Sequence, residues 1–316
     1  MSHYVVTGGA GFIGSAIVRR LLREGARRVV VIDNLLTGHE SNLEEVRRAI
    51  DFQRADIREY EAIAPLIRGA AVVFHEAAIP SVPRSIEEPV PSHDINITGT
   101  FNVLRAAHVG RAGRVVYAAS SSAYGDTEVL PKVEGMTPQP KSPYALHKLV
   151  GEHYCRIFSE VYGVETVSLR YFNVYGPRQD PTSPYSGVLS LFLKAVLERR
   201  SPTIFGDGEQ SRDFTYVEDV ADLNLKAARA KGVSGGLYNA GTGGRITLNQ
   251  AWALVQKLEG INIPAVYGPP RAGDVRHSQA DTTAAVRDLG YAPRYSFEEG
   301  MRLTLEWYRA VADNKV

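Results

Sequence analysis

The chain has 316 residues, of which 44% are hydrophobic and 22% are charged, a composition that excludes a disordered or fibrous protein. Its formal net charge of +1 lacks the basic excess of nucleic-acid binders, so we expect no nucleic-acid partner. The single cysteine, Cys155, cannot form an internal disulfide, and no signal segment precedes the first strand-like run, which favours a cytoplasmic location. No apolar run is long enough for a bilayer and the histidines lack metal-ligand spacing, so we expect neither a membrane partner nor a metal site.

Short β-branched runs alternate with amphipathic helical segments through the first half of the chain. The predicted strands are residues 4–6, 29–32, 52–53, 71–74, 114–117 and 166–169. Strands that alternate with helices predict a parallel sheet covered on both faces, which is a doubly wound α/β fold of the Rossmann type. We therefore expect residues 1–171 to form a dinucleotide-binding domain.

The second half of the chain is denser in glycine and proline, as in Gly176-Pro177 and Gly268-Pro269-Pro270. This texture predicts a smaller C-terminal α/β lobe, residues 172–316, that captures the substrate. The strand-like run 237–239 follows a helical segment, so we expect segments near 214–240 to return to the first sheet. The two lobes therefore share chain segments, and no single residue separates them.

A glycine-rich turn, Gly8, Gly11 and Gly14, joins the first predicted strand to a helix that opens with Phe12 and Ile13. Glycines permit the tight bend, let backbone amides approach a pyrophosphate, and direct a helix N-terminus at its negative charge. An ordinary glycine-rich turn is the alternative. The preceding strand and the following helix favour the dinucleotide site.

Five further positions at strand ends extend this site. Asp33 ends the second strand, where its carboxylate would accept hydrogen bonds from the adenosine ribose and repel a 2′-phosphate. Asn34 follows without an arginine that could accept such a phosphate, so the sequence favours NAD over NADP. Asp56 and Ile57 end the third strand region, near the expected path of the adenine, although Asp56 could also be a surface carboxylate. Ala77 follows the fourth strand and is small enough for the cofactor to lie close.

A second motif supplies the candidate chemistry. Tyr144 and Lys148 are four residues apart, which places a phenol and an ammonium on one face of a helix. The fifth strand ends at Ser120, at the carboxyl edge where an open α/β sheet presents its reactive groups. A nearby ammonium and a cationic nicotinamide would favour the phenolate, so Tyr144 is the predicted general base. The spacing of Tyr144 and Lys148 is by itself weak evidence for a catalytic pair. Ser120 could instead hydrogen-bond to backbone groups.

These motifs together resemble the extended short-chain dehydrogenase/reductase family. The matching segments are TGGAGFIG at residues 7–14, the serine run followed by Tyr124-Gly125, and the Tyr144-x-x-x-Lys148 pair. Within that family the chain is similar to the UDP-galactose (UDP-hexose) 4-epimerases. That similarity rests on Asn96, Asn173, Arg212, Arg271 and Asp274.

The resemblance implies a role for each of these positions. Asn96 would shape the active-site helix beside the cofactor, and Asn173 would touch the sugar or the diphosphate. Arg212 and Arg271 would neutralise phosphate oxygens, and Asp274 would bind the uridine ribose. Phe205 either packs on the uracil or belongs to the core, and the sequence leaves both open.

The resemblance also implies a reaction. Tyr144 would take the proton of the sugar 4-hydroxyl while C4 delivers hydride to a tightly bound NAD, and return of the hydride to the opposite face of the 4-keto sugar would invert C4. Ser120 would assist by hydrogen bonding, and Lys148 would hold the nicotinamide ribose. Related 4,6-dehydratases carry an Asp-Glu pair directly after the catalytic hydroxyl residue, where this chain has Ser121 and Ser122. We therefore expect a UDP-hexose 4-epimerase.

Two positions bear on the identity of the sugar. Asp180 stands where relatives that act on uronic acids often have an arginine, which favours a neutral hexose over UDP-glucuronate. A UDP-glucuronate 4-epimerase or decarboxylase is the alternative within this class. Ser278 falls where some relatives have a bulky tyrosine beside the C2 substituent, so the N-acetylated UDP-GlcNAc and UDP-GalNAc are candidates beside UDP-glucose and UDP-galactose. Ser278 could instead cap the following turn.

Two broader questions complete the hypothesis. A non-catalytic dinucleotide-binding sensor is the alternative of another class, but such a protein need not keep Tyr144 and Lys148. The helical segment around Tyr144 carries additional apolar residues, namely Leu149, Val150, Tyr154, Ile157, Phe158 and Val161. Relatives pair through this helix and the segment 98–108, so we expect a homodimer.

Overall fold

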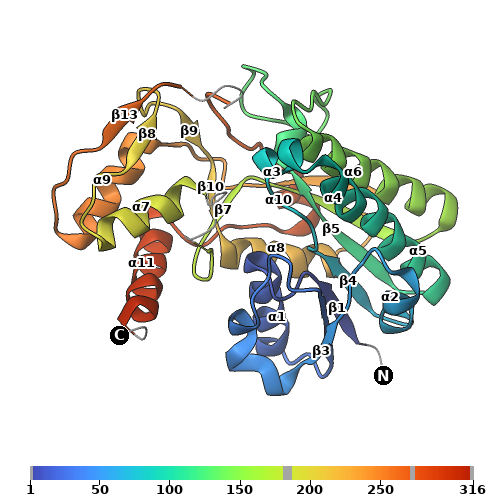
Figure 1. Cartoon of the computed structure of the whole chain (residues 1–316). Coiled ribbons are helices and arrows are strands. Elements are labelled where there is room, and N and C mark those ends of the chain that lie inside the picture. Colours follow the sequence, from blue (N-terminus) through green and yellow to red (C-terminus); the bar gives the residue numbers. More distant parts are fainter. Residues whose placement is uncertain (1–2, 181–186, 271–274, 314–316) are drawn as a thin grey trace.

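The computed structural model describes residues 3–180, 187–270 and 275–313. A seven-stranded parallel sheet, in the order β11-β6-β5-β4-β1-β2-β3, organises the first half of the chain (Figure 1). Its strands are β1 (Tyr4–Thr7), β2 (Val29–Asp33), β3 (Asp51–Arg54), β4 (Val72–His75), β5 (Arg114–Ser120), β6 (Glu165–Tyr171) and β11 (Gly236–Ala240). Every predicted strand falls within it, and the doubly wound α/β class is confirmed.

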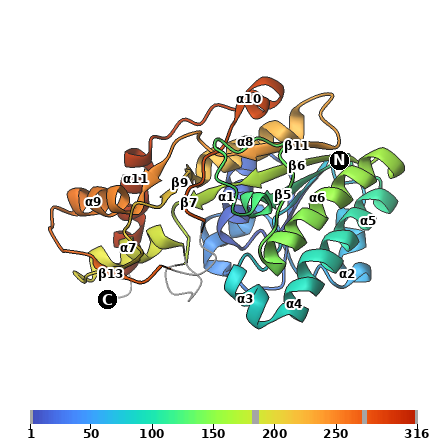
Figure 2. The same ribbon diagram turned by 90° about the horizontal axis from the view of Figure 1, so that it is seen from above.

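Helices cover both faces of this sheet. They are α1 (Phe12–Arg23), α2 (Tyr60–Ile67), α5 (Thr100–Gly110), α6 (Pro143–Tyr162), α8 (Val217–Arg229) and α10 (Thr283–Leu289). Successive side chains of a strand point to opposite faces, so Val5 and Val30 join the core under α2, α5 and α6, whereas Val6 and Val31 join the core under α1 and α8. Figure 2 shows α5 and α6 on one side of the sheet and α8 on the other.

Shorter elements connect the sheet to these helices. A 3₁₀ segment (Glu40–Ala49) follows β2, and helices α3 (Val82–Glu87) and α4 (Pro89–His93) with a π-helical turn (Asp94–Gly99) lead into α5. A 3₁₀ turn (Ser121–Tyr124) ends β5. Because all strands of a parallel sheet end at the same edge, the turns after β1, β2, β4 and β5 converge there.

The chain beyond β6 adds a second core of its own. Its strands pair as β7 (Asn173–Tyr175) with β10 (Phe214–Tyr216), β8 (Thr203–Phe205) with β13 (Val266–Gly268), and β9 (Ser211–Arg212) with β12 (Ile246–Thr247). Helices α7 (Val188–Leu197), α9 (Leu248–Glu259) and α11 (Phe297–Asp313) enclose this core. Since β11 and α8 belong to the main sheet, the later half of the chain contributes to both cores. The division into lobes at residue 171 remains a proposal.

Across the part of the chain that the structure describes, no helix combines the length and apolar character that crossing a bilayer would require. The cytoplasmic location stays a prediction.

Candidate active site

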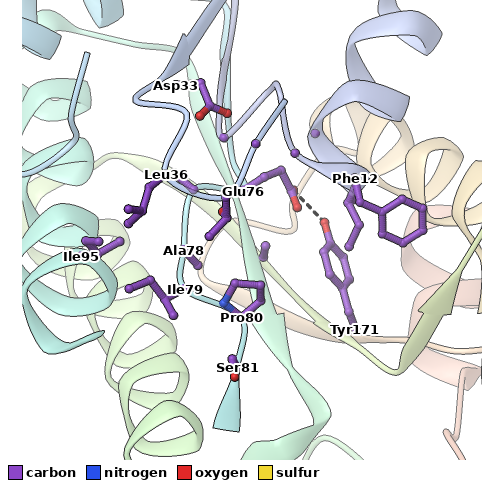
Figure 3. Close-up of a pocket in the computed structure, with 18 of the residues that line it drawn as sticks. Phe12, Asp33, Leu36, Glu76, Ala78, Ile79, Pro80, Ser81, Ile95 and Tyr171 are labelled. Carbon is purple, nitrogen blue, oxygen red and sulfur yellow. Dashed lines mark hydrogen bonds between the residues drawn. The ribbon is translucent and has the colours of Figure 1, made fainter. Parts of the chain in front are cut away.

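A cavity of about 670 Å³ opens at the carboxyl edge of the main sheet. Figure 3 shows its wall from Phe12 and Asp33 across Glu76 to Ile79 and Tyr171. Most of the predicted cofactor and catalytic residues line it: Gly8, Gly11, Phe12, Ile13, Gly14, Asp33, Asn34, Asp56, Ile57, Ala77, Ser120, Tyr144 and Lys148. The structure thus brings together residues that the sequence spreads over β1, β2, β4, β5 and α6.

The glycine-rich turn leaves no room for side chains. Gly8 has φ +68°, and a Cβ there would lie 2.6 Å from the backbone nitrogen of Ala77. A Cβ on Gly14 would lie 2.2 Å from the carbonyl oxygen of Gly8. The first turn of α1, which the structure describes in full, carries no acidic side chain that would oppose an anion. The turn therefore fits a pyrophosphate at the helix N-terminus.

Asp33 is held with its carboxylate inside the cavity wall. Its Oδ2 accepts a hydrogen bond from the amide of Ala10 at 2.9 Å, and its Oδ1 accepts one from the amide of Leu35 at 2.8 Å. Burial raises the pKa of Asp33, and these two amides oppose that shift. Each oxygen keeps a further lone pair, so the carboxylate can accept two ribose hydroxyls.

Asp56 forms the next part of the wall as a paired carboxylate. Arg58 donates to both of its oxygens, and Asn34 Nδ2 donates to Oδ2 at 2.8 Å. Hydrogen bonding from Arg58 is the main reason that the pKa of Asp56 falls to about 2. Asp56 therefore stays charged and fixes Asn34 beside the cavity.

Helix α6 presents the catalytic candidates. Ser142 caps it by accepting a hydrogen bond from the amide of Ala145 at 3.2 Å, and the amide of Tyr144 donates to Ser85 Oγ at 3.1 Å. A Cβ on Gly151 would lie 2.1 Å from the hydroxyl of Tyr117, so glycine lets α6 approach β5 closely. These contacts place Tyr144 and Lys148 beside Ser120 in one cavity.

Burial dominates the electrostatics of this group. It raises the pKa of Tyr144, and hydrogen bonding to Ser120 offsets part of that shift. It also lowers the pKa of Lys148, whose Nζ donates to the carbonyl of Ala118 at 2.7 Å. Burial thus opposes the phenolate in the folded chain, and the expectation that Lys148 and a cationic nicotinamide together favour the phenolate stays a prediction.

Asn96, expected to shape the active-site helix beside the cofactor, does not line the cavity. Its side chain is buried, its Oδ1 accepts from the amide of Ile79 at 2.8 Å, and its Nδ2 donates to the carbonyl of Ile79 at 3.2 Å. Ile79 does line the cavity. Asn96 thus holds the segment after β4 that lines the cavity, and a direct contact with the cofactor stays a prediction.

Apart from Ser120 and Tyr144, the described residues predicted to bind substrate lie on β7, β8 and β9 or, in the case of Ser278, hydrogen-bond to β9. Asn173 Nδ2 donates to Ser278 Oγ at 3.3 Å, and Arg212 Nη1 donates to the carbonyl of Arg276 at 3.2 Å. Phe205 lies on β8. These four residues do not line the cavity described above. Arg271 and Asp274 lie outside the described residues, so their expected contacts remain predictions.

Two residues that contribute to the site were missed from sequence, and of these Glu76 lines the cavity. Glu76 directly follows β4 and accepts a hydrogen bond from the hydroxyl of Tyr171 at 2.8 Å (Figure 3). Ser85 holds the amide of Tyr144. A lone acidic residue between a buried strand and two alanines was the available signal for Glu76. Nothing in the local sequence distinguishes Ser85 from other serines.

Comparison with known proteins identifies the family. Residues 4–241 match the NAD dependent epimerase/dehydratase family. The chain belongs to this family. The expected resemblance to the extended short-chain dehydrogenase/reductases and the expected NAD cofactor are thereby confirmed.

The relatives act on different nucleotide sugars. A putative UDP-glucose 4-epimerase of Methanocaldococcus jannaschii is 39% identical over 96% of this chain and 98% of its own length. A UDP-glucuronate 4-epimerase of Thermodesulfobacterium geofontis is 32% identical over 97% of this chain and 96% of its own. The structure of a UDP-N-acetylglucosamine 4-epimerase from Methanobrevibacter ruminantium M1, in complex with UDP-N-acetylmuramic acid, has a TM-score of 0.94 at 36% identity and covers 98% of this chain and 99% of that one.

Proposed function

We propose that this protein is an NAD-dependent 4-epimerase that interconverts UDP-glucose and UDP-galactose and also accepts UDP-GlcNAc and UDP-GalNAc. The observation that carries the proposal is the convergence of Ser120, Tyr144 and Lys148 in one cavity with the glycine-rich turn and Asp33. The similarity to 4-epimerases over nearly the whole chain supports the same reaction.

Each side chain has a defined task in this reaction. The turn and Asp33 would hold NAD, which would supply the acceptor for the C4 hydride and later the donor that returns it. Tyr144 accepts the proton of the sugar 4-hydroxyl and returns it once the ketone has presented its other face. Ser120 hydrogen-bonds the 4-oxygen, and Lys148 holds the nicotinamide ribose. Because burial raises the pKa of Tyr144, the phenol needs added positive charge from the bound cofactor to ionise.

The cavity favours a neutral sugar. Asp180 lies in its wall, with Oδ2 at 3.6 Å from Nε2 of His39. A second carboxylate brought close to Asp180 would be repelled, which argues against a uronic acid. UDP-glucuronate 4-epimerase or decarboxylase remains the second candidate, because a UDP-glucuronate 4-epimerase is among the similar proteins.

The test is a product analysis of the purified protein. We expect it to convert UDP-galactose and UDP-GalNAc to their C4 epimers without added metal, and to leave UDP-glucuronate unchanged, as resolved by chromatography. The Tyr144→Phe variant, incubated in parallel, distinguishes turnover at this site from a contaminant. Conversion of UDP-glucuronate alone would replace the proposal with the second candidate, and no conversion by protein that binds NAD would favour the non-catalytic sensor.

We also infer a homodimer through α5 and α6. Ile157 is 40% exposed and Val161 is 68% exposed on successive turns of α6, and Phe101 on α5 is 39% exposed. A second copy of the same surface would cover them. Light scattering should give twice the chain mass for the wild type and the single-chain mass for an Ile157→Asp/Val161→Asp variant. Val266→Asp, which alters an exposed valine on β13, should remain dimeric, and a monomeric wild type would refute the inference.

A further inference from the structure

A carboxylate in the cavity has no task in the reaction described above. Glu76 follows β4 and lines the same cavity as Tyr144 and Lys148. Its Oε1 accepts a hydrogen bond from the hydroxyl of Tyr171 at 2.8 Å. The hydroxyl oxygen of Tyr171 in turn accepts a hydrogen bond from Nδ2 of Asn224 at 2.7 Å. Figure 3 shows the Glu76 side chain directed at Tyr171 inside the pocket. Residues of β6 and α8 therefore hold this carboxylate in a fixed place.

Lys148 faces the same cavity with partners that carry no formal charge. Its Nζ donates to the carbonyl of Ala118 at 2.7 Å and lies 5.2 Å from the ring centroid of Tyr117. Only 4% of Lys148 is exposed. A buried ammonium that is supported by a carbonyl and a ring loses its proton more readily than one in water. A negative charge nearby opposes that loss and favours the protonated form.

The other ionisable groups around Lys148 on α6 are either neutral or already paired with a positive charge. Glu152 is held through both carboxylate oxygens by Arg170, at 2.8 and 2.7 Å, so its charge is already matched. Burial raises the pKa of Cys155 to about 12, so its thiol is neutral. Burial likewise raises the pKa of Tyr144.

The neighbouring strands contribute neutral groups as well. Burial lowers the pKa of His75 on β4 to about 3, so its imidazole is uncharged. Burial raises the pKa of Tyr117 on β5 and of Tyr171 on β6 well above the ordinary value. Among the described acidic groups that face Lys148, Glu76 is thus the carboxylate that no guanidinium neutralises.

We propose that Glu76 is a positioning residue for catalysis: it keeps Lys148 protonated, and the Tyr171 and Asn224 side chains hold its carboxylate in place for that purpose. The proposal deepens the proposed function, because the charge of Lys148 matters for turnover only if Tyr144 is the base. Glu76 itself neither accepts the substrate proton nor touches the sugar in this scheme.

The direction of the effect follows from the charges. Burial lowers the pKa of Lys148, and the charge of Glu76 opposes that shift; burial raises the pKa of Glu76, and the charge of Lys148 opposes it. Removing the Glu76 charge therefore lowers the pKa of Lys148 further. The ammonium is then lost at a lower pH, so the alkaline limb of kcat/KM against pH moves to lower pH. A neighbouring charge typically shifts a pKa by about one unit or more.

The experiment compares wild type with Glu76→Gln, which removes the charge and keeps the shape. Protein with bound NAD carries lysine labelled with ¹³C at Cε, and Lys148→Arg assigns one signal among the eight lysines. We expect the Lys148 signal in Glu76→Gln to titrate about one pH unit lower or more, with the alkaline limb of kcat/KM moving equally. Tyr171→Phe, which removes the hydrogen bond to Glu76, should shift the signal in the same direction by less.

Two controls make the result specific. Glu76→Asp retains the charge and should restore the wild-type titration. Glu134→Gln removes a half-buried carboxylate that does not line the cavity, so the titration of Lys148 should stay unchanged. An unmoved Lys148 signal in Glu76→Gln, or an equal shift in Glu134→Gln, would overturn the proposal. A shifted signal in protein that turns over no nucleotide sugar would support the Glu76 proposal and refute the proposed function.

Discussion

Two regions are held together by different means: the edge of the main sheet that lines the cavity, called the cofactor wall here, and the group around Asn173 and Ser278, called the substrate wall. The cofactor wall is the edge of one parallel sheet, where the strand register pairs Thr7 with His75 and Val73 with Val115. The substrate wall joins separate segments through side chains. The carboxylate of Asp213, for example, accepts hydrogen bonds from the backbone amides of Thr242, Gly243 and Ala280.

This difference predicts different responses to substitution. Residues at strand ends share one rigid backbone framework, so a change there should affect the reaction or the cofactor without altering the choice of sugar. Residues of the substrate wall depend on individual hydrogen bonds between loops, such as the one from Asn173 to Ser278. A change there should alter which sugar binds and leave the chemistry intact.

The largest effect is expected at Tyr144. Tyr144→Phe removes the base and keeps the ring, so kcat should fall by about 10²- to 10⁴-fold while the NAD content of the purified protein stays at the wild-type value. Stopped assays with UDP-galactose measure the first quantity, and absorbance of cofactor released by denaturation measures the second. Wild-type turnover in this variant would show that the phenol is not the base.

A smaller effect on the same wall is expected at Gly14. A Cβ there would lie 2.2 Å from the carbonyl oxygen of Gly8, so Gly14→Ala must displace the turn. We expect a lower NAD content, with activity partly restored by added NAD. Gly135→Ala is the matched control, because a Cβ at Gly135 would meet nothing within 4 Å. Equal NAD content in both variants would contradict the assignment of the turn to the cofactor.

Sequence predicted the cofactor wall well because its residues follow a repeating rule. Parallel strands end at one edge, so Asp33, Ser120 and the glycine-rich turn could be placed together before their side-chain contacts were known. The contacts of Asn96 could not be predicted, because a helical residue in this region can face either the cavity or the segment after β4, and only packing decides. The effect of burial on the pKa of Tyr144 could not be predicted, because burial is a property of the folded chain.

The substrate wall could be predicted only by resemblance. Asn173 Nδ2 and Ser278 Oγ lie 3.3 Å apart, although the two residues are far apart in sequence. No local sequence pattern connects them. Glu76 illustrates the same limit on the cofactor side, since its partners Tyr171 and Asn224 come from β6 and α8. Contacts that depend on which loop meets which helix carry no periodic signal.

The smallest and most selective effect is expected at Ser278, on the substrate wall. Ser278→Tyr adds bulk beside the position proposed for the C2 substituent, so kcat/KM for UDP-GalNAc should fall by about ten- to a hundredfold, while kcat for UDP-galactose changes little. Paired assays of the two substrates measure the ratio. Ser278→Ala removes the hydroxyl that accepts from Asn173 and keeps the space, so it should retain UDP-GalNAc turnover. If Ser278→Tyr slowed both sugars equally, the position would support the wall as a whole, and the proposed separation between the two walls would fail at this residue.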